Sequence, residues 1–596
     1  MTDHSPKYNI RHKNGGNAYR LNRRALLAGG GVAALAGAVA GGGALAATDA
    51  KAVAWDQVFD VICVGSGAAA LSAAVTATHE GQAALVLEKA PMFGGTTAKS
   101  GAVFWIPNNF VLRERGIDDE RTACLQYLCR FAYPARYTPD SPTMGLEPAA
   151  FRLIEAFYDN GYVMTDFMRD IGALKVAEWR MYHLDRPATD YLSHVPENKV
   201  PTGRALGPDI GGGKTGWGTD MIAQFEAWLK GRGVPMLTNH EVVEIVMQNG
   251  AAVGVKVAHQ GKLLAFCARK GLVFGTGGFS HNPELINLHQ PGNIYGSCAQ
   301  ASSTGDFVNL GAMAGAKMGN LWSAWRTQVV LEETLENRVV GLGVFVVPGD
   351  SMLIVNKYGQ RAVNEKRNYN DRTRIHYAYD PGKAEFPNHL MFMIYDRRTA
   401  DIYRGSFPYP QDPDKGRFVI KADSLEELAT KIDARLAQHA AKIGGVRLAD
   451  GFSNNLQATV ARFNGFARAG KDADFGRGAN SYDTEWDQVF GVRRESDWPA
   501  NELPNLTMYP LADQGPYYAI ILAPGALDTN GGPVINERAQ VINGAGEPIP
   551  GLYGAGNCIA CPSHTAYYGA GGTIGLALTF GYIAGRQVAK EVARDI

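Results

Sequence analysis

The sequence predicts an α/β protein in which a Rossmann-like dinucleotide-binding domain carries an inserted second domain of α+β type. The first observation is the apolar run Val61–Val64, which ends in the turn Gly65-Ser66-Gly67. The second is Glu88, an acidic residue that closes another apolar run 23 positions after Gly65. Strand, glycine turn and a carboxylate at this spacing are typical of dinucleotide-binding domains. The third observation is a series of further glycine clusters along the chain.

Each part of this motif has a physical role in holding a pyrophosphate and a ribose. Val61–Val64 is expected to form a short buried strand, and the glycines after it let the backbone approach the pyrophosphate. A helix that opens at Ala68 directs its N-terminal N–H groups at the phosphate, with Ala70 in the place of a third glycine. Glu88 is placed to accept the adenosine ribose hydroxyls. The motif alone is weak in a chain with 71 glycines, and the alternative is a glycine turn in another α/β sheet.

Four further glycine-rich segments favour FAD over a nicotinamide cofactor. They are residues 93–101, 275–279, 551–557 and 569–575. A nicotinamide protein needs one such turn, whereas an extended flavin dinucleotide touches the backbone at several places, including a late helix N-terminus. The predicted cofactor-binding residues are Gly65, Ser66, Gly67, Ala68, Ala69, Glu88, Lys89, Gly95, Thr96, Thr97, Ser100, Gly101, Gly277, Gly278, Gly556, Asn557, Gly572, Thr573 and Ile574.

The composition argues against several function classes. The chain has 58 basic and 58 acidic residues, of which residues 1–46 hold six and one, so 52 and 57 remain and the net charge is −5. Neither a nucleic-acid face nor a polybasic membrane patch is indicated. A hydrophobic fraction of 46% in 596 residues suits a globular protein with a large core and more than one domain.

The N-terminus has the pattern of a targeting signal. Arg23 and Arg24 form a twin-arginine motif, a weakly apolar Gly/Ala segment follows, and Ala44-Leu45-Ala46 offers a small-residue cleavage site. We therefore expect residues 1–46 to be a twin-arginine signal peptide and the mature protein to be periplasmic. The alternative is an N-terminal membrane anchor, but its many glycines make a poor lipid helix, so no stable membrane span is expected after processing.

Seven cysteines give no sign of a metal site, and none is predicted. Cys558 and Cys561 form a C-x-x-C motif, but Pro562 follows where haem attachment requires histidine, and zinc would need a second pair. A disulfide between Cys558 and Cys561, or between Cys124 and Cys129, stays open. Because no c-type haem is encoded, electrons must pass to or from a separate partner, a quinone or a redox protein.

The expected domain organisation is a flavin domain in two pieces, residues 55–285 and 512–596, around a catalytic domain over 286–511. Apolar spacing predicts helices at 147–171, 219–231, 424–443 and 454–468. Short β-patterned runs occur at Met236–Asn239, Val242–Gln248, Val253–Ala258 and Leu263–Cys267. They look like a sheet inserted before a separate strand, Leu272–Phe274.

The order of the glycine segments resembles the FAD-binding dehydrogenases of the fumarate reductase and 3-ketosteroid dehydrogenase superfamily, over about residues 55 to 590. The resemblance implies a FAD-binding domain of the glutathione-reductase type with an inserted catalytic domain. It also implies non-covalent FAD, because covalent relatives carry a histidine just after the glutamate and residues 93–101 contain none.

One branch of this superfamily is not favoured. Members of fumarate reductase type grip two carboxylates with arginines and histidines, including an arginine in the C-terminal glycine loop and a His-Pro-Thr after a Thr-Gly-Asp turn. Here no His-Pro-Thr follows Thr304-Gly305-Asp306, and the loop Ser563–Gly572 has no arginine. A dicarboxylate would lack its bidentate partners, which argues against fumarate or urocanate reduction.

The same loop is similar to that of 3-ketosteroid Δ1-dehydrogenases, in which a tyrosine and a backbone N–H bind the substrate ketone. On this resemblance the tyrosine is Tyr567 and the N–H belongs to Gly571. Proton removal next to a ketone makes an enolate, and a hydroxyl and an N–H aimed at its oxygen stabilise the charge. Two alternatives stay open: Tyr567 packs above the flavin without touching substrate, or a one-residue slip gives its role to Tyr568.

The segment Val355–Tyr369 also resembles this family and places the family's proposed base at Tyr369. Because an unperturbed tyrosine has a pKa of about 10, such a base needs positive charge or hydrogen bonds nearby. The candidates in sequence are Arg367, Arg372 and Arg374. The alternative is a buried tyrosine satisfied by backbone. A third family tyrosine, which assists the base, is matched by Tyr191, with Tyr182 as a competitor.

Together these residues predict flavin-dependent α,β-desaturation of a cyclic ketone, either a 3-ketosteroid or a smaller ring such as cyclohexanone. The segment between Tyr191 and the helix near 219 is shorter than in the steroid enzymes and includes the glycine-rich run Gly211–Gly216, which makes the smaller ring a serious candidate. One rival is a periplasmic, fumarate-reductase-like reductase of an activated double bond. The other is an exported electron-transfer subunit with flavin but no substrate pocket.

Overall fold

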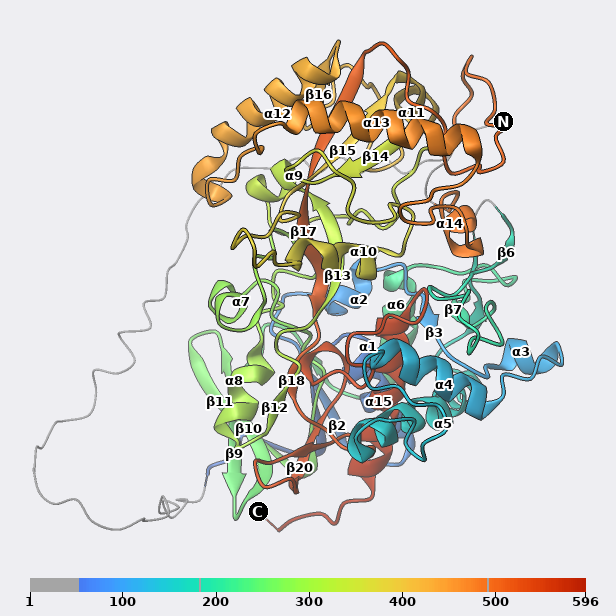
Figure 1. The fold of residues 1–596 in the computed structure, drawn as a ribbon. Helices are drawn as coiled ribbons and strands as arrows, with labels where there is room; N and C mark the ends of the chain where they lie inside the picture. Colours follow the sequence, from blue (N-terminus) through green and yellow to red (C-terminus); the bar gives the residue numbers. More distant parts are fainter. Residues whose placement is uncertain (1–52, 182–183, 490–492, 596) are drawn as a thin grey trace, which may run out of the picture. The chain divides into compact units, whose positions relative to one another are not determined.

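The computed structural model describes residues 53–181, 184–489 and 493–595 (Figure 1). The twin-arginine motif, the rest of residues 1–46 and Tyr182 lie outside the described residues. Within these ranges no helix is long and apolar enough to cross a membrane.

An eight-stranded sheet with a parallel centre contains the predicted dinucleotide motif (Figure 1). Its strands run in the order β19-β20-β11-β1-β2-β8, and β10 and β9 extend it from β11. The bounds are Gln57–Val64 (β1), Ala84–Leu87 (β2), Met236–Leu237 (β8), Glu241–Gln248 (β9), Ala251–His259 (β10), Lys262–Phe274 (β11), Gln540–Ile542 (β19) and Pro548–Gly554 (β20). β1 pairs in parallel with β2 and β11. Residues 60–64 of β1 and all of β2 are buried, as is typical of parallel strands covered on both faces. The predicted α/β class is confirmed.

Two of the predicted short runs take different places in this sheet. Leu263–Cys267 is not a separate strand, because β11 continues through Leu272–Phe274: residues 262–267 pair with β10 and residues 272–274 with β20. Met236–Leu237 lies at the outer edge of the parallel sheet beside β2, and not in an inserted sheet. Apolar alternation does not specify which neighbour a strand pairs with. The sequence alone therefore could not show that these two runs belong to the main sheet.

Helices α1 (Ala68–His79) and α15 (Gly572–Ala589) pack closely against each other beside the parallel sheet. A Cβ at Gly581 would overlap the carbonyl oxygen of Ala69, and one at Gly585 would lie 2.7 Å from that of Ala73. The two glycines are four residues apart, so they share one face of α15 and let the two backbones approach. This contact sets α15 against the helix of the glycine turn.

A second, antiparallel sheet lies in the upper part of Figure 1, with α12 (Leu425–Gln438) and α13 (Phe452–Ala469) near it. Its strands are β13 (Ala324–Val330), β14 (Met352–Val355), β15 (Met391–Asp396), β16 (Ile420–Ala422) and β17 (Tyr517–Thr529). β17 starts just after the predicted domain boundary at 512, yet it pairs with β13, β15 and β16. The boundaries themselves stay a prediction.

The remaining elements surround these two sheets. The predicted helices are confirmed as α5 (Pro148–Asp170), α6 (Gly218–Lys230), α12 and α13, although α12 ends earlier than expected and a short 3₁₀ turn, Ala440–Lys442, follows it. The other helices are α2 (Gly95–Lys99), α3 (Phe110–Glu114), α4 (Arg121–Ala132), α7 (Pro283–His289), α8 (Asp306–Met313), α9 (Leu331–Glu336), α10 (Tyr369–Thr373), α11 (Arg397–Ile402) and α14 (Ser481–Trp486). Short strands are β3 (Phe104–Trp105), β4 (Val176–Glu178), β5 (Arg180–Met181), β6 (Arg186–Pro187), β7 (Ala205–Pro208), β12 (Met318–Gly319) and β18 (Gly532–Pro533).

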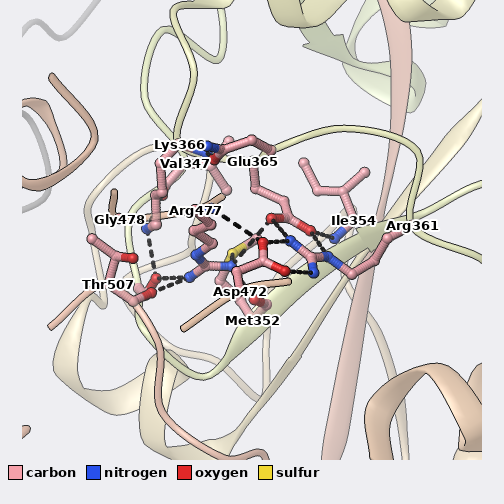
Figure 2. Close-up of polar contacts among 12 residues, drawn as sticks. Val347, Met352, Ile354, Arg361, Glu365, Lys366, Asp472, Arg477, Gly478 and Thr507 are labelled. Atoms are coloured by element: carbon pink, nitrogen blue, oxygen red, sulfur yellow. Dashed lines mark hydrogen bonds and ion pairs between the residues drawn. The ribbon is translucent and has the colours of Figure 1, made fainter. Parts of the chain in front are cut away.

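A buried ion network joins the segment before α10 to the turn after α13 (Figure 2). The Arg361 guanidinium contacts Glu365 at 2.7 Å (Nε to Oε1) and Asp472 at 2.9 Å (Nη2 to Oδ2). Arg477 lies 3.4 Å from the other oxygen of Glu365 and donates to the Met352 carbonyl at 2.8 Å. These four charged side chains are at most 3% exposed, so the network fixes the chain that leads into α10.

Removing one charge from this network is expected to be costly. In Glu365→Gln the two arginines keep only Asp472 as a counter-ion, and breaking a buried pair typically lowers the free energy of unfolding by about 3–5 kcal/mol. Glu226→Gln is the control, because Glu226 pairs with Lys230 on the surface of α6 and such pairs contribute about 0.3–0.5 kcal/mol. Urea unfolding measures both variants, and similar midpoints for the two would contradict a structural role for the network.

Candidate active site

A cavity follows the ends of β1 and β11 and the first turns of α1 and α15. Among the predicted cofactor residues, its lining includes Gly65, Ser66, Gly67, Ala68, Ala69, Glu88, Lys89, Gly95, Thr96, Thr97, Ser100, Gly277, Gly556, Asn557, Thr573 and Ile574. Gly101, Gly278 and Gly572 are not part of the lining. The cavity therefore brings together segments from both ends of the chain and its middle.

The turn after β1 requires glycine for two separate reasons. Gly65 has a left-handed φ of +100°, and a Cβ there would lie 2.5 Å from the Gly275 carbonyl oxygen. A Cβ at Gly275 would in turn lie 2.7 Å from the Ala70 nitrogen. The ends of β1 and β11 thus meet the start of α1 without side chains between them, which leaves the N–H groups of α1 beside the cavity.

Glu88 is buried at the cavity wall and is held by two hydrogen bonds. Its carboxylate accepts from Ser66 Oγ at 2.6 Å and from the Ala90 N–H at 2.8 Å. Ser66 Oγ also accepts from the Gly94 N–H at 2.8 Å, so the hydroxyl links the glycine turn, the acidic residue and the start of α2. The orientation of the carboxylate is set by the protein, while each oxygen keeps a further lone pair for a ribose hydroxyl.

Residues that the sequence did not single out complete the cavity, chiefly Trp325 and Asp528. The buried Asp528 carboxylate accepts from the Gly278 N–H at 2.8 Å and from Ser303 Oγ at 2.8 Å. Gly278 therefore supports the site through Asp528. Trp325 and Asp528 face each other in the β13–β17 ladder, and a bulge there leaves Leu527, another lining residue, unpaired. No local motif marks such residues, because the pairing of distant strands brings them to the cavity.

Three predicted tyrosines meet in a buried cluster. The hydroxyl of Tyr191 donates to that of Tyr369 at 3.0 Å. The ring of Tyr567 stacks on Tyr191 at 5.3 Å and meets Tyr369 edge-on at 5.4 Å. Tyr369 opens α10 and Tyr567 lies in the loop before α15, so residues far apart in sequence converge here. Tyr182, the competitor of Tyr191, lies outside the described residues.

The structure separates the two neighbouring tyrosines. Tyr568 points into an aromatic group with Trp105, Phe131 and Phe157, at ring distances of 5.4, 6.0 and 6.3 Å. Its carbonyl accepts from the Tyr127 hydroxyl at 2.7 Å. Only Tyr567 of this pair faces Tyr369 and Tyr191, so a slip in favour of Tyr568 does not fit the packing.

Burial dominates the acid–base properties of the cluster. It raises the pKa of Tyr369 well above that of a free tyrosine, and the neighbouring Tyr191 and Tyr567 add to the increase. The expected arginines do not offset this effect. Arg372 donates to Gln328 Oε1 at 2.8 Å and to the Val344 carbonyl at 2.6 Å. The Arg372 guanidinium is therefore bound to Gln328 and to backbone carbonyls and not to Tyr369. The raised pKa keeps Tyr369 in its neutral phenol form.

The start of α15 connects the tyrosines with the cavity. Gly571, the N-cap, has a φ of +86°, and a Cβ there would overlap the backbone of Val103. A Cβ at Gly572 would lie 3.3 Å from the ring of Tyr567, which places that ring against the first turn. The N–H groups of a first turn lack helical acceptors and carry partial positive charge. These N–H groups are therefore suited to stabilise an oxygen that gains negative charge during a reaction.

Trp325 bridges the tyrosine cluster and the cavity. Its ring meets Tyr567 edge-on at 5.2 Å, and its Nε1–H donates to Asn557 Oδ1 at 2.9 Å. Both Trp325 and Asn557 line the cavity. The reactive end of a cofactor in this cavity is therefore expected near Thr573 and the tyrosines.

The cysteines form no disulfide in this structure. All seven are free thiols, so neither Cys558–Cys561 nor Cys124–Cys129 is joined. Cys558 instead donates to the Phe274 and Ala555 carbonyls at 3.4 and 3.3 Å. Within the described residues no group of three or more His, Cys, Asp or Glu side chains is arranged to hold a metal.

Comparison with known proteins identifies the family. The model of the FAD binding domain family matches residues 60–574. The chain belongs to this FAD-binding family. It is 30% identical to 3-oxosteroid 1-dehydrogenase of Mycolicibacterium smegmatis, over 90% of this chain and 98% of that protein. It is 31% identical to 4-oxocyclohexanecarboxylate 2-dehydrogenase of Sinomonas cyclohexanicum, over 90% and 94%.

A solved structure supports the same assignment. The crystal structure of 3-ketosteroid Δ1-dehydrogenase from Sterolibacterium denitrificans in complex with 1,4-androstadiene-3,17-dione superposes with a TM-score of 0.73. Sequence identity is 25%, and the match covers 89% of this chain and 99% of that one. The predicted superfamily and FAD as cofactor are confirmed, and the chain is a FAD-dependent oxidoreductase.

The described residues fit the FAD of this family. The glycine turn and the start of α1 suit the pyrophosphate, the buried Glu88 suits the adenosine ribose, and the start of α15 suits the flavin end. When bound, FAD supplies a two-electron acceptor next to the tyrosine cluster. Its non-covalent attachment stays a prediction.

Gly65→Ala is expected to prevent FAD loading, because the added methyl would lie between the glycine turn and Gly275. Gly81→Ala is the matched control: its φ is +81°, but a Cβ there meets nothing within 4 Å. Flavin absorbance per protein measures loading.

Acid precipitation of the wild type should release the flavin into the supernatant, whereas a yellow pellet would rule out non-covalent attachment.

Proposed function

We propose that this enzyme desaturates a cyclic ketone between the α and β carbons, with FAD as the electron acceptor. The single observation that carries the proposal is the cluster of Tyr191, Tyr369 and Tyr567, which contacts Trp325 in the wall of the FAD cavity. The names of the relatives, 3-oxosteroid 1-dehydrogenase and 4-oxocyclohexanecarboxylate 2-dehydrogenase, support a ring ketone as the substrate class.

In the proposed reaction Tyr369 removes the α proton. Its raised pKa makes the phenolate a strong base that is sparsely populated at neutral pH. The Tyr191 hydroxyl, 3.0 Å away, is placed to donate a hydrogen bond to that phenolate. Tyr191 thereby stabilises the phenolate that forms when Tyr369 loses its own proton to solvent, and uptake of the α proton returns Tyr369 to the neutral phenol.

Tyr567 and the start of α15 act on the carbonyl. The Tyr567 hydroxyl and the N–H of Gly571 are assigned to the ketone oxygen, where negative charge develops as the α proton leaves. The tyrosine rings are in mutual contact, with Tyr191 stacked on Tyr567 at 5.3 Å. Because these two rings touch, a ring ketone is expected to reach the Tyr567 hydroxyl only after the rings move apart.

The ring size is proposed to be small. β7 ends at Pro208 and α6 begins at Gly218, and the connection between them contains three successive glycines with left-handed φ, Gly211, Gly212 and Gly213. This short turn offers little surface to cover a four-ring steroid. Cyclohexanone and a 3-ketosteroid are the two arms of a substrate test, in which anaerobic bleaching of the flavin reports reduction by the ketone.

A reductase of an activated double bond would use the same site in reverse. It is disfavoured because the loop 563–572 has no arginine to hold a dicarboxylate. An electron-transfer subunit without a substrate site is disfavoured by the tyrosine cluster. The electron acceptor is proposed to be a separate quinone or redox protein.

Replacing the hydroxyls of Tyr369 and Tyr567 is expected to give different defects. Tyr369→Phe should lower turnover by about 10² to 10⁴-fold, the usual contribution of general acid–base catalysis. Tyr567→Phe should lower it by about 10² to 10³-fold, as loss of an oxyanion donor does, and should also weaken ketone binding. Steady-state kinetics with cyclohexanone and a 3-ketosteroid separate the two effects.

Exchange of the α hydrogens with deuterated water isolates the proton step. With the flavin already reduced, wild type and Tyr567→Phe should exchange, the variant more slowly, and Tyr369→Phe should not. Tyr568→Phe is the control, because its ring lies in a separate aromatic group. Exchange at the wild-type rate by Tyr369→Phe would place the base elsewhere.

Export by the twin-arginine route is proposed from Arg23 and Arg24. Replacing both with lysine is expected to leave uncleaved enzyme in the cytoplasm, because this signal is read by a receptor. Cell fractionation with an activity assay measures the distribution. Replacing Arg11 with lysine is the control for a basic residue outside the motif, and unchanged periplasmic activity of the double variant would refute the proposal.

A further inference from the structure

A second cavity, of about 200 Å³, adjoins β13. Trp325 lines the cofactor cavity and Arg326 lines the second one. Because successive strand residues point to opposite faces, the two cavities lie on opposite sides of β13. The second cavity is much larger than the space of one water and has room for a small molecule.

Arg326 is a buried cation with neutral neighbours. Its guanidinium donates to the Tyr377 hydroxyl at 2.9 Å, to Gln290 Oε1 at 2.6 Å and to the Trp322 carbonyl at 3.2 Å. It also lies over the Tyr377 ring, 4.5 Å from the centroid. Arg326 is 5% exposed and forms no ion pair with a carboxylate among the residues that the structure describes. A buried charge without a counter-ion is costly, so an anion in this cavity would stabilise it.

Arg374 adds a second positive charge to the same cavity. It is exposed, lines the cavity and forms no ion pair within the described ranges. Its charge acts on Arg326 and, with burial as the larger cause, lowers the pKa of that guanidinium. Asp371 is close enough for the charge of Arg374 to act on it, but the two form no ion pair within the described residues, and the Asp371 oxygens accept from Asn368 at 2.8 Å and Asn370 at 3.2 Å. Two arginines therefore face this cavity without a dedicated counter-ion.

We propose that this cavity binds a small organic carboxylate, with Arg326 and Arg374 on the carboxylate and Trp322 beside its apolar body. Guanidinium groups match the planar, two-oxygen geometry of a carboxylate. Trp322, which is 47% exposed, lines the cavity with Pro291, and the two supply an apolar wall that a free inorganic anion would not use. The ligand class is thus an acid with a ring or short hydrocarbon body.

Asn370, another lining residue, links the cavity to the segments that carry Tyr369 and Tyr567. Asn370 Oδ1 accepts from the backbone N–H of Arg326 at 3.0 Å, and the Asn370 side-chain amide donates to the Thr565 carbonyl at 3.3 Å. Asn370 follows Tyr369, and Thr565 precedes Tyr567 by two residues. The proposed ligand therefore sits next to the segments that carry the tyrosines, in a site of its own.

Titration calorimetry of the FAD-loaded enzyme with cyclohexanecarboxylate tests the site. This acid has an apolar ring and no ketone, so it is not a substrate for the proposed desaturation. One binding event is expected, weakened up to about fivefold in Arg374→Gln, since an ion pair of an exposed side chain typically contributes about 0.2–1 kcal/mol. Arg538→Gln is the control, because Arg538 is exposed and outside this cavity, and it should bind like the wild type.

Three outcomes would overturn the inference. One is equal binding by wild type and Arg374→Gln. Another is loss of binding in Tyr567→Phe with retention in Arg374→Gln, which would place the acid at the tyrosine cluster. The third is displacement of the acid by equimolar inorganic phosphate, which would show a general anion site. Ketone turnover by the wild type is a separate readout, so failure of the proposed function leaves this test intact.

Discussion

The position of Tyr369 depends on the buried ion network of Arg361, Glu365, Asp472 and Arg477 (Figure 2). The chain between β14 and α10 has little regular structure, so its backbone groups need donors from elsewhere. The buried Arg372 supplies two of them, to the carbonyls of Glu365 and Arg367. Buried guanidinium groups thus take the place of sheet hydrogen bonds. They fix geometry, because a displaced guanidinium would leave several buried groups unsatisfied at once.

This anchoring has a consequence for the chemistry. The arginines nearest Tyr369 in sequence are committed to backbone or to acidic side chains, as Arg367 lies 3.7 Å from Asp483. The site therefore holds Tyr369 as a neutral phenol. In the proposed reaction, negative charge must be stabilised on the two oxygens that carry it. The Tyr191 hydroxyl stabilises the Tyr369 phenolate, and Tyr567 with the start of α15 stabilises the ketone oxygen. Preorganised dipoles of this kind act without reorganisation during the reaction.

The dinucleotide motif could be predicted from the sequence because its parts are neighbours along the chain. The strand Val61–Val64, the glycine turn, the helix after it and the spaced Glu88 all lie within 28 residues, and each constrains its neighbours. Trp325 and Asp528 were missed because they reach the cavity through the pairing of β13 with β17, which joins residues about 200 positions apart. Tyr567 was preferred to Tyr568 on the family resemblance alone, and the residues themselves left a one-residue slip open. Both are buried aromatics, and only the surrounding rings distinguish them.

The bulge between β13 and β17 explains how one strand pair serves two cavities. Trp325 pairs with Asp528 and Arg326 pairs with Ala526, so Leu527 is the extra residue. Bulges bend a strand and re-aim its side chains. Here the bulge places Trp325, Leu527 and Asp528 together at the cofactor cavity. Arg326, on the other face, meets the second cavity. The Arg326 guanidinium is thus separated from the FAD cavity by a single strand, and the Arg326 backbone N–H binds Asn370, the residue after Tyr369.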